Sequence, residues 1–425
     1  MMQFAELPRL WRIVLNRLVN VGRADIVRLR HAKWMAVRST EGKPCDDGLT
    51  LALDLAELKS LSQLGRDFIL KLANTSVRFG VLDIGVDRSL PKIASNELDR
   101  FTRFVESKVT NRRVLIFAAG EIEKDANNYN ILTPFWEFQS GLPEVSPAIF
   151  ANVDHIVVFS RFCETYFKRI SPPGIGVDYI RYPLPDDWCV RMAREDVRVK
   201  YGIPQNAFTV FFHFDFRSGY DRKNPEGALR AFVKAFAHDQ GAKIVIKAAG
   251  ADWDIRNSMR FRSLIKELRI EKNIVTVYDF LSHQEILDLI GASDVYISLH
   301  RGEGLGIGML EAMSVGTPVV ATAYGGNMDF TNDDTAMLVG YDMVKPKTSF
   351  ALYRGVVEWP EPDEAEAAAA LKTLRNRPEF AKKKAANAKR FIDNYFSITN
   401  FTNDIIALLT ATEVPSRQEG RLLIS

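Results

Sequence analysis

The clearest pattern in the chain is His300-Arg301-Gly302-Glu303-Gly304-Leu305-Gly306-Ile307-Gly308-Met309-Leu310-Glu311. An apolar run at 295–299 precedes this stretch and strong helix formers follow it, so the sequence predicts a strand, a glycine-rich loop and a helix. Loop glycines let backbone N–H groups approach a ligand, and the N-terminus of a helix carries partial positive charge. A phosphate group is therefore the expected guest.

Two glutamates, Glu303 and Glu311, flank this predicted anion site. Carboxylates repel phosphate, so we expect them to accept hydrogen bonds from hydroxyl groups attached to it. A sugar nucleotide has hydroxyl-bearing rings on both sides of its diphosphate and suits this arrangement. The alternative is an ordinary glycine-rich turn with two solvated acids.

Length and composition indicate a globular protein of two domains. The chain has 425 residues, of which 47% are hydrophobic and 26% charged, so neither a disordered nor a fibrous protein is expected. No apolar run reaches the roughly 18 to 20 residues of a membrane span, and no signal-peptide pattern is found, so we expect a cytoplasmic protein. Cys45, Cys163 and Cys189 are widely spaced, which argues against disulfides and a zinc site.

The net charge of +3 conceals a basic N-terminal segment. Residues 1–43 hold nine lysines and arginines against three acids, and apolar residues recur among them at helical spacing. This pattern predicts a basic amphipathic helix, which could lie on an anionic membrane surface or pack on the first domain. No aromatic-interleaved basic run or binding motif suggests nucleic acid as a partner.

Strands and helices are predicted to alternate through most of the chain, which favours parallel sheets with crossover helices. Prolines between 172 and 185 interrupt the pattern, so we place a domain boundary near residue 200. The predicted parts are a basic helical extension (1–47), a first Rossmann-like domain (48–200), a second one (201–385), and a C-terminal helix and tail (386–425). The predicted strands cover 49–53, 114–117, 155–159, 208–212, 243–247, 274–277, 295–299 and 318–322, and the predicted helices include 227–236, 364–371 and 381–392.

The segment 303–327 resembles the retaining GT-B glycosyltransferases of family 4, through Glu303, Glu311, the Gly-Thr-Pro at 316–318 and the Gly-Gly-Asn at 325–327. The resemblance implies an α/β fold of two Rossmann-like domains facing a cleft. The nucleotide-sugar donor would bind the C-terminal domain and the acceptor the first. Whether the C-terminal helix crosses back to the first domain stays open.

A second motif, residues 217–225, resembles the family's arginine and lysine, six residues apart, that hold the donor diphosphate. The fork-shaped guanidinium of Arg217 and the mobile ammonium of Lys223 complement phosphate oxygens and the charge that develops on a departing diphosphate. An exposed basic loop is the alternative.

The resemblance also implies roles for individual residues. Glu303 would lie near hydroxyls of the transferred sugar, and Glu311 would accept hydrogen bonds from the nucleotide ribose. Lys223, Arg217, Glu303 and Glu137 are the predicted catalytic residues. The predicted donor-binding residues are Arg217, Lys223, Asn224, Phe280, Leu281, Arg301, Glu303, Gly304, Leu305, Gly306, Ile307 and Glu311, with the base near 279–281.

The sequence departs from the family pattern in the first domain. Family members often have a histidine near the anomeric carbon and a paired-glycine loop, whereas no histidine ends the strand at 114–117 and only Gly65 marks the loop. We expect Glu137 to stand nearer the reacting centre. His155 and His213 are interpreted as packing residues, because a lone histidine on a strand is more often a satisfied core residue.

Shorter segments at 133–138, 153–160, 298–301, 324–330 and 359–363 resemble a bacterial branch that builds surface polysaccharides. The expected activity is transfer, with retention, of a hexose or deoxyhexose from GDP-mannose, a UDP-sugar or dTDP-rhamnose to a glycan or lipid-linked oligosaccharide in lipopolysaccharide or capsule synthesis. A nucleotide-sugar epimerase and a non-catalytic glycan-binding or scaffold subunit are the alternatives.

No cofactor or metal is expected. Residues 252–254 read Asp-Trp-Asp, which mimics the metal-binding DxD motif of another glycosyltransferase fold. We interpret them as a surface loop, because Arg217 and Lys223 already serve the donor. The alternating glycines from 302 to 308 do not satisfy GxGxxG, so a dinucleotide-binding oxidoreductase is not indicated.

Overall fold

The computed structural model describes residues 45–53, 55, 60–83, 95–105, 111–117, 128–141, 150, 152–237, 239–347 and 355–412. The basic helix predicted within 1–47 lies outside these residues, except that the first strand begins at Cys45. The tail beyond residue 412 also lies outside them.

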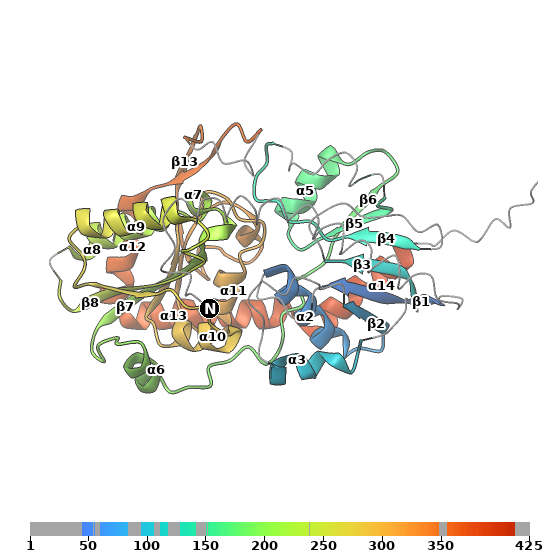
Figure 1. Cartoon of the computed structure of the whole chain (residues 1–425), viewed down its shortest axis with the longest axis horizontal. Coiled ribbons are helices and arrows are strands. Elements are labelled where there is room, and N and C mark those ends of the chain that lie inside the picture. The colour runs from blue at the N-terminus through green and yellow to red at the C-terminus, as the bar shows by residue number, and fades with distance from the viewer. Residues whose placement is uncertain are drawn as a thin grey trace, which may run out of the picture.

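The first domain is built on a parallel six-stranded sheet with the order β2-β1-β3-β4-β5-β6. Figure 1 shows it as the lobe that carries the labels of these strands and of α5. Its strands are β1 (Cys45–Leu53), β2 (Arg78–Asp83), β3 (Asn111–Ile116), β4 (Tyr129–Leu132), β5 (His155–Val158) and β6 (Gly176–Tyr179). Its described helices are α2 (Ser60–Leu72), α3 (Ser95–Thr102) and α5 (Arg161–Ile170).

The second domain repeats this plan with the strand order β12-β11-β10-β7-β8-β9, again parallel. Its strands are β7 (Phe208–Asp215), β8 (Ala242–Ala249), β9 (Ile274–Val277), β10 (Val295–Ser298), β11 (Val319–Thr322) and β12 (Met337–Val339). The main helices are α8 (Pro225–Phe236), α9 (Ile255–Glu267), α10 (His283–Gly291), α11 (Ile307–Ser314) and α12 (Glu364–Asn376). An antiparallel pair, β13 (Tyr341–Val344) with β14 (Trp359–Pro362), extends from this domain. The predicted α/β fold of two Rossmann-like domains is confirmed.

The connection between the domains ends earlier in the chain than the sequence predicted. Helix α6 (Arg194–Lys200) packs on the second domain, because the buried guanidinium of Arg198 donates to the carbonyl of Ala292 and pairs with Asp294 at 3.1 Å. The second domain therefore begins at about residue 194, before the predicted boundary near 200.

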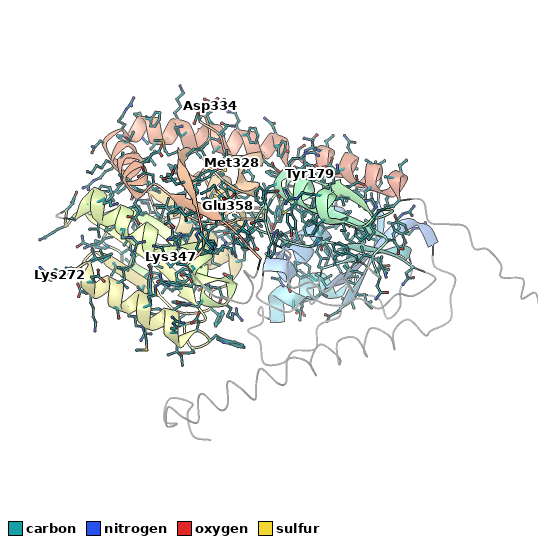
Figure 2. The ribbon with its side chains drawn as sticks, turned by 90° about the horizontal axis from the view of Figure 1, so that it is seen from above. Tyr179, Lys272, Met328, Asp334, Lys347 and Glu358 are labelled. Atoms are coloured by element: carbon teal, nitrogen blue, oxygen red, sulfur yellow. The ribbon has the colours of Figure 1, made fainter. Side chains whose placement is uncertain are left out.

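The C-terminal helices return from the second domain to the first, along one side of both lobes in Figures 1 and 2. Helix α13 (Pro378–Tyr395) packs on α11, and α14 (Ile398–Ala411) lies on the first domain. Arg181 pairs with Asp404 at 2.6 Å, and Arg113 donates to the carbonyl of Thr412 at 2.7 Å.

A continuous apolar core joins the two domains. One cluster of fully buried side chains includes Phe68 of α2, Trp188 of the connection, Leu310 of α11 and Phe401 of α14. Because burial of apolar surface stabilises any contact in proportion to its area, this cluster fixes how the two sheets face each other. None of the helices in the described part of the chain is long and apolar enough to cross a membrane.

Candidate active site

The candidate site lies where the strand order of the second sheet reverses. Strands β7 and β10 are neighbours there, although β8 and β9 intervene in the chain. Loops that follow neighbouring strands with opposite crossover directions leave a crevice at the carboxyl edge of the sheet, where ligands bind in such folds. The loop after β7 carries Arg217 and Lys223, and the loop after β10 carries Glu303.

Glu303 forms the centre of a buried charge cluster. Its carboxylate lies 2.6 Å from Nζ of Lys223 and 3.8 Å from the guanidinium of Arg222. Burial alone would raise the pKa of Glu303, but Lys223 and Arg222 outweigh it and lower this pKa to about 2. The ammonium of Lys223 has three N–H donors, so it can keep Glu303 and still offer donors to a phosphate.

Arg217 is held in place by Asp215, the last residue of β7. Its Nε and Nη2 atoms donate to the two carboxylate oxygens at 3.0 and 2.5 Å, in a bidentate pair. The guanidinium also lies over the rings of Trp253 and Phe280, at 5.5 and 5.2 Å from their centroids. The third nitrogen, Nη1, is buried without a hydrogen-bond partner, so it can donate to an anion in the crevice.

Glu311 is the fifth residue of α11, and its side chain is only 5% exposed. One carboxylate oxygen lies 3.0 Å from Nε2 of His283, and the other lies 3.6 Å from Nε2 of His213. Burial favours a raised pKa for Glu311, but the hydrogen bond from His283 holds the pKa below its usual value. Glu311 is therefore a carboxylate, and one of its oxygens has no hydrogen-bond donor.

The glycine-rich loop is pressed against the first domain. A Cβ atom on Gly302 or Gly304 would come within 2.9 Å of the carbonyl oxygens of Glu137 or Trp136. Ser160, the N-cap of α5, donates from Oγ to the carbonyl of Gly304 at 2.6 Å. The loop glycines thus allow the second domain to meet the first at the site.

Gly306 ends the loop in a conformation that other residues adopt at a cost. Its φ of 100° is in the left-handed region, and it is the N-cap of α11 without a side-chain cap. Ile307 is the first residue of the helix, so the backbone N–H groups of the first turn of α11 point back toward the loop. The predicted strand, glycine-rich loop and helix are confirmed.

Several predicted donor-binding residues have side chains that are engaged within the protein. Asn224 caps α8 by accepting from the N–H of Gly227, and its amide donates to the carbonyl of Leu299. Leu281 and Leu305 are core residues, at 9% and 2% exposure. Phe280 is 38% exposed beside Arg217, where a base could stack on it.

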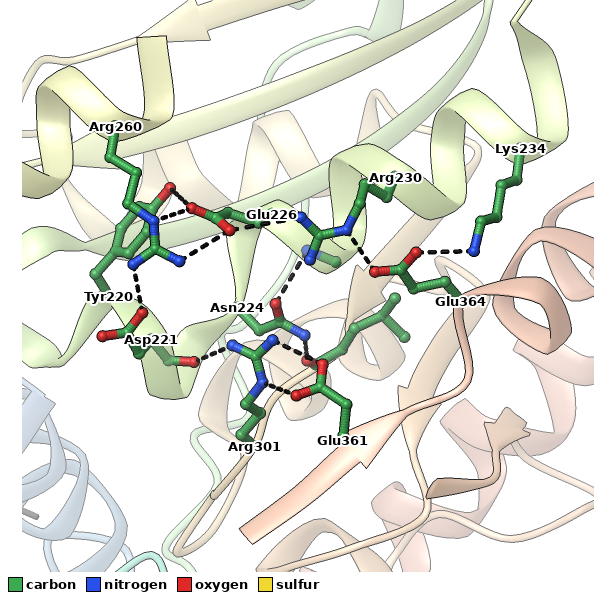
Figure 3. A network of polar contacts seen from close by, with 12 residues as sticks. Tyr220, Asp221, Asn224, Glu226, Arg230, Lys234, Arg260, Arg301, Glu361 and Glu364 are labelled. Carbon is green, nitrogen blue, oxygen red and sulfur yellow. Dashed lines mark hydrogen bonds and ion pairs between the residues drawn. The ribbon is translucent and has the colours of Figure 1, made fainter. Parts of the chain in front are cut away.

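The side chain of Arg301 is also engaged within the protein. Figure 3 shows its guanidinium in a bidentate pair with Glu361 of β14, with both contacts at 2.7 Å, and it donates to the carbonyl of Asp221. The guanidinium lies over the ring of Trp359 as well. The side chain of Arg301 therefore joins the loop to the β13–β14 pair.

Glu137 of the first domain reaches the charge cluster through Arg222. The guanidinium of Arg222 lies 3.4 Å from Glu137 and 3.8 Å from Glu303, and it donates to the carbonyl of Gly302. Neither Arg222 nor His283 was predicted from the sequence to be a site residue. Arg222 directly precedes Lys223 in the motif, whereas nothing local marks His283, which lies 28 residues before Glu311.

Among the other residues singled out from the sequence, some lie at the site and others pack elsewhere. His155 pairs with Asp178 at 2.9 Å in the first domain, as a satisfied packing residue should. His213 lies at the site beside Glu311, although burial lowers its pKa to about 4 and keeps it neutral. Gly65 lets α2 approach β1, since its Cβ would meet Leu53 at 2.3 Å. The Asp-Trp-Asp loop caps α9 with Asp254 and presents its tryptophan to Arg217.

Part of the second domain is similar in sequence to known proteins. Residues 194–391 match the family model described as glycosyl transferases group 1. A D-inositol 3-phosphate glycosyltransferase of Corynebacterium aurimucosum is 29% identical over 194 residues, 44% of this chain and 40% of the relative. An N-acetyl-alpha-D-glucosaminyl L-malate synthase of Bacillus anthracis is 27% identical over 131 residues, 31% of each chain. The chain thus aligns with 40% or less of the length of these curated relatives.

The whole chain is similar in fold to solved structures. HepE of Anabaena, crystallised with UDP and glucose, superposes with a TM-score of 0.63 at 14% identity, covering 86% of this chain and 100% of that one. Sucrose-phosphate synthase of Thermosynechococcus elongatus gives a TM-score of 0.57 at 16% identity, with the same coverage. At these identities the similarity concerns the fold. The chain therefore has the GT-B fold, and its residues 194–391 match the family model of glycosyl transferases group 1.

Proposed function

We propose that this protein is a retaining glycosyltransferase, which transfers a hexose or deoxyhexose from a nucleoside diphosphate sugar to a hydroxyl group. The observation that carries the proposal is the juxtaposition of two cations and two buried carboxylates at one crevice of the second sheet. Lys223 and Arg217 suit a diphosphate, and Glu303 and Glu311 suit the hydroxyl groups on either side of it. The family match to residues 194–391 supports the same assignment.

In the proposed reaction the bond between the anomeric carbon and the diphosphate oxygen breaks first, and its electron pair leaves with the diphosphate. Lys223 and Nη1 of Arg217 stabilise the negative charge that develops there. The acceptor oxygen then bonds to the anomeric carbon from the leaving-group face, and its proton passes to the departing diphosphate. Glu303 accepts from hydroxyls of the transferred sugar, while Glu137 lies on the first-domain side of Arg222.

The acceptor is proposed to bind the first domain. The sequence resemblance favours a glycan or lipid-linked oligosaccharide of a bacterial surface polysaccharide, at the cytoplasmic side of a membrane. The names of the relatives instead refer to small acceptors, inositol phosphate and malate. Both classes of acceptor therefore belong in an assay. We propose that no metal ion takes part, because the two cations supply the charge that a metal would otherwise provide.

A thermal-shift screen of UDP, GDP, dTDP and their sugars tests the first step. We expect one nucleotide series to raise the melting temperature of the wild-type protein, because a ligand that binds only the folded state stabilises it. Lys223→Met should show a smaller shift, because one of the two cationic donors to the diphosphate is lost while Arg217 remains. Lys234→Met, which removes an exposed lysine paired with Glu364 at 2.9 Å in the same domain, is the matched control and should keep the wild-type shift.

Product analysis with the selected donor tests the second step. Transfer to an added acceptor, with the anomeric configuration kept, supports a retaining transferase. A change of the sugar without any acceptor would support an epimerase instead. If no nucleotide shifts the melting temperature and no donor is consumed, the proposal is wrong and a non-catalytic binding role is favoured.

A further inference from the structure

We infer that His283 is a positioning residue that orients Glu311 for the ribose of the donor; this inference rests on the proposed function. His283 is the first residue of α10, and its Nε2 atom lies 3.0 Å from Oε1 of Glu311. The two side chains are 16% and 5% exposed. An N–H donated to a buried carboxylate is a charge-assisted hydrogen bond, which is stronger than a neutral one.

Contacts on both sides hold the imidazole of His283 in one orientation. Its backbone is fixed by a capping box, in which Ser282 accepts from the N–H of Glu285 and the Glu285 carboxylate accepts from the N–H of Ser282. Its ring packs on the indole of Trp188, with the centroids 4.8 Å apart. Trp188 belongs to the connection between the domains and packs in turn on Tyr182, at 5.9 Å. Because the ring of His283 is held in one orientation, it determines the position of the Glu311 carboxylate.

The other oxygen of Glu311 is the part of this arrangement that lacks a protein donor. Oε2 is buried without a hydrogen-bond partner, and His213 at 3.6 Å is too far to donate. Nδ1 of His213 likewise has no partner. An unsatisfied buried charged oxygen is costly, which points to a hydroxyl of the ligand as its donor. With Oε1 held by His283, Oε2 is presented to the crevice.

Binding measurements with nucleotides that lack one ribose hydroxyl test this inference. Isothermal titration calorimetry would compare UDP, 2′-deoxy-UDP and 3′-deoxy-UDP, and GDP and dTDP would be tried if UDP does not bind. For the wild type we expect at least one deoxynucleotide to bind about tenfold more weakly than UDP, because the bond to Glu311 is lost. In His283→Leu, which keeps the volume but has no N–H donor, UDP itself should bind about tenfold more weakly, and the preference for the intact ribose should fall toward one.

A conservative variant and a matched control separate positioning from folding. His283→Gln keeps an N–H that can reach Glu311, so it should recover most of the affinity and of the ribose preference. His155→Leu removes another buried histidine paired with a carboxylate, Asp178, and should change neither. Should His283→Leu fail to fold, His283→Ala, which also lacks the N–H donor, replaces it, and the same loss of affinity and of ribose preference is expected.

The outcomes distinguish this inference from the proposed function. If none of UDP, GDP and dTDP binds the wild type, the proposed function fails and this inference fails with it. If the wild type prefers the intact ribose and His283→Leu binds UDP within twofold of the wild type with the same preference, the inference about His283 alone is overturned.

Discussion

Replacing Lys223 by methionine should lower both turnover and stability, by separable amounts. Methionine keeps most of the length of the side chain but removes the ammonium that lies 2.6 Å from Glu303. In turnover, the loss of one preorganised donor at a developing negative charge costs about 100- to 1000-fold. The binding step should weaken less, because Arg217 still offers a donor to the diphosphate.

The stability effect can be estimated from the pKa of Glu303. Neighbouring cations lower this pKa from 4.5 to about 2, and such a shift corresponds to roughly 3 kcal/mol of interaction with the ionised form. Because Arg222 remains 3.8 Å away, we assign about half of this, roughly 1 to 2 kcal/mol, to Lys223. The free energy of unfolding of Lys223→Met at pH 7 should be lower by that amount.

The sign of the pH dependence follows from the lowered pKa. A carboxyl with a depressed pKa contributes stability that is present above about pH 4.5 and is lost as the pH falls toward 2. The difference between wild type and Lys223→Met should therefore shrink over this range. In the double variant Lys223→Met with Glu303→Gln, the uncompensated buried charge is gone, so stability at pH 7 should return while turnover does not.

The assays are denaturant unfolding between pH 3 and 7 and steady-state turnover of the donor chosen by the thermal-shift screen. Lys234→Met is the control, because it loses an exposed pair and should change both quantities little. Turnover of Lys223→Met within a few-fold of wild type would refute the role of this lysine at the leaving group. An unchanged stability at pH 7 would refute the paired charge cluster.

Three other predictions concern different parts of the molecule. Burial raises the pKa of Asp67 to about 7, so the folded protein should lose stability as the pH rises from about 4 to 7. The free energy of unfolding of Asp67→Asn should therefore rise relative to that of the wild type over this range. An equal difference between the two proteins in unfolding curves at pH 5 and pH 8 would contradict this. Gly304→Ala would place a methyl group 2.9 Å from the carbonyl of Trp136 and should lower turnover about tenfold or more by moving the loop. Gly316→Ala is no matched control because Gly316 has a positive φ, so Ala312→Gly in α11 serves for comparison. Wild-type turnover of Gly304→Ala would show that the loop tolerates the shift. Titration with EDTA should leave turnover unchanged, whereas complete loss that manganese restores would establish a metal requirement.

The sequence predicted the parts of the fold that are long, apolar and flanked by turns. The strand at 274–277 matches β9, and the helix at 227–236 lies inside α8. Strands β4 and β6 were not predicted, because polar residues such as Asn130 and Asp178 interrupt their apolar runs. They are strands because they pair with β5 on either side, and pairing between distant segments leaves no local signal.

The candidate site was predictable to a similar extent. The residue types of the glycine-rich loop and the Arg217 motif indicated an anion site, and the fold brings both to one crevice. The pairing of Lys223 with Glu303 spans 80 residues and depends on which strands are neighbours. The sequence around Asn224 also fits a helix N-cap, because Asn followed by proline is a typical N-cap with proline at the first helical position. The sequence context of His283 offers no comparable hint.

In the described part of the chain, the polypeptide passes between the domains twice, once through the connection that carries Trp188 and once through the junction of α13 with α14. Two interdomain connections permit bending about the line that joins them and resist rotation of the domains about any other axis. Arg113 and Arg181 anchor α14 to the first domain, so the connection between α13 and α14 is held in place. The two connections therefore help to keep the loop at Gly304 in register with the first-domain backbone at Trp136.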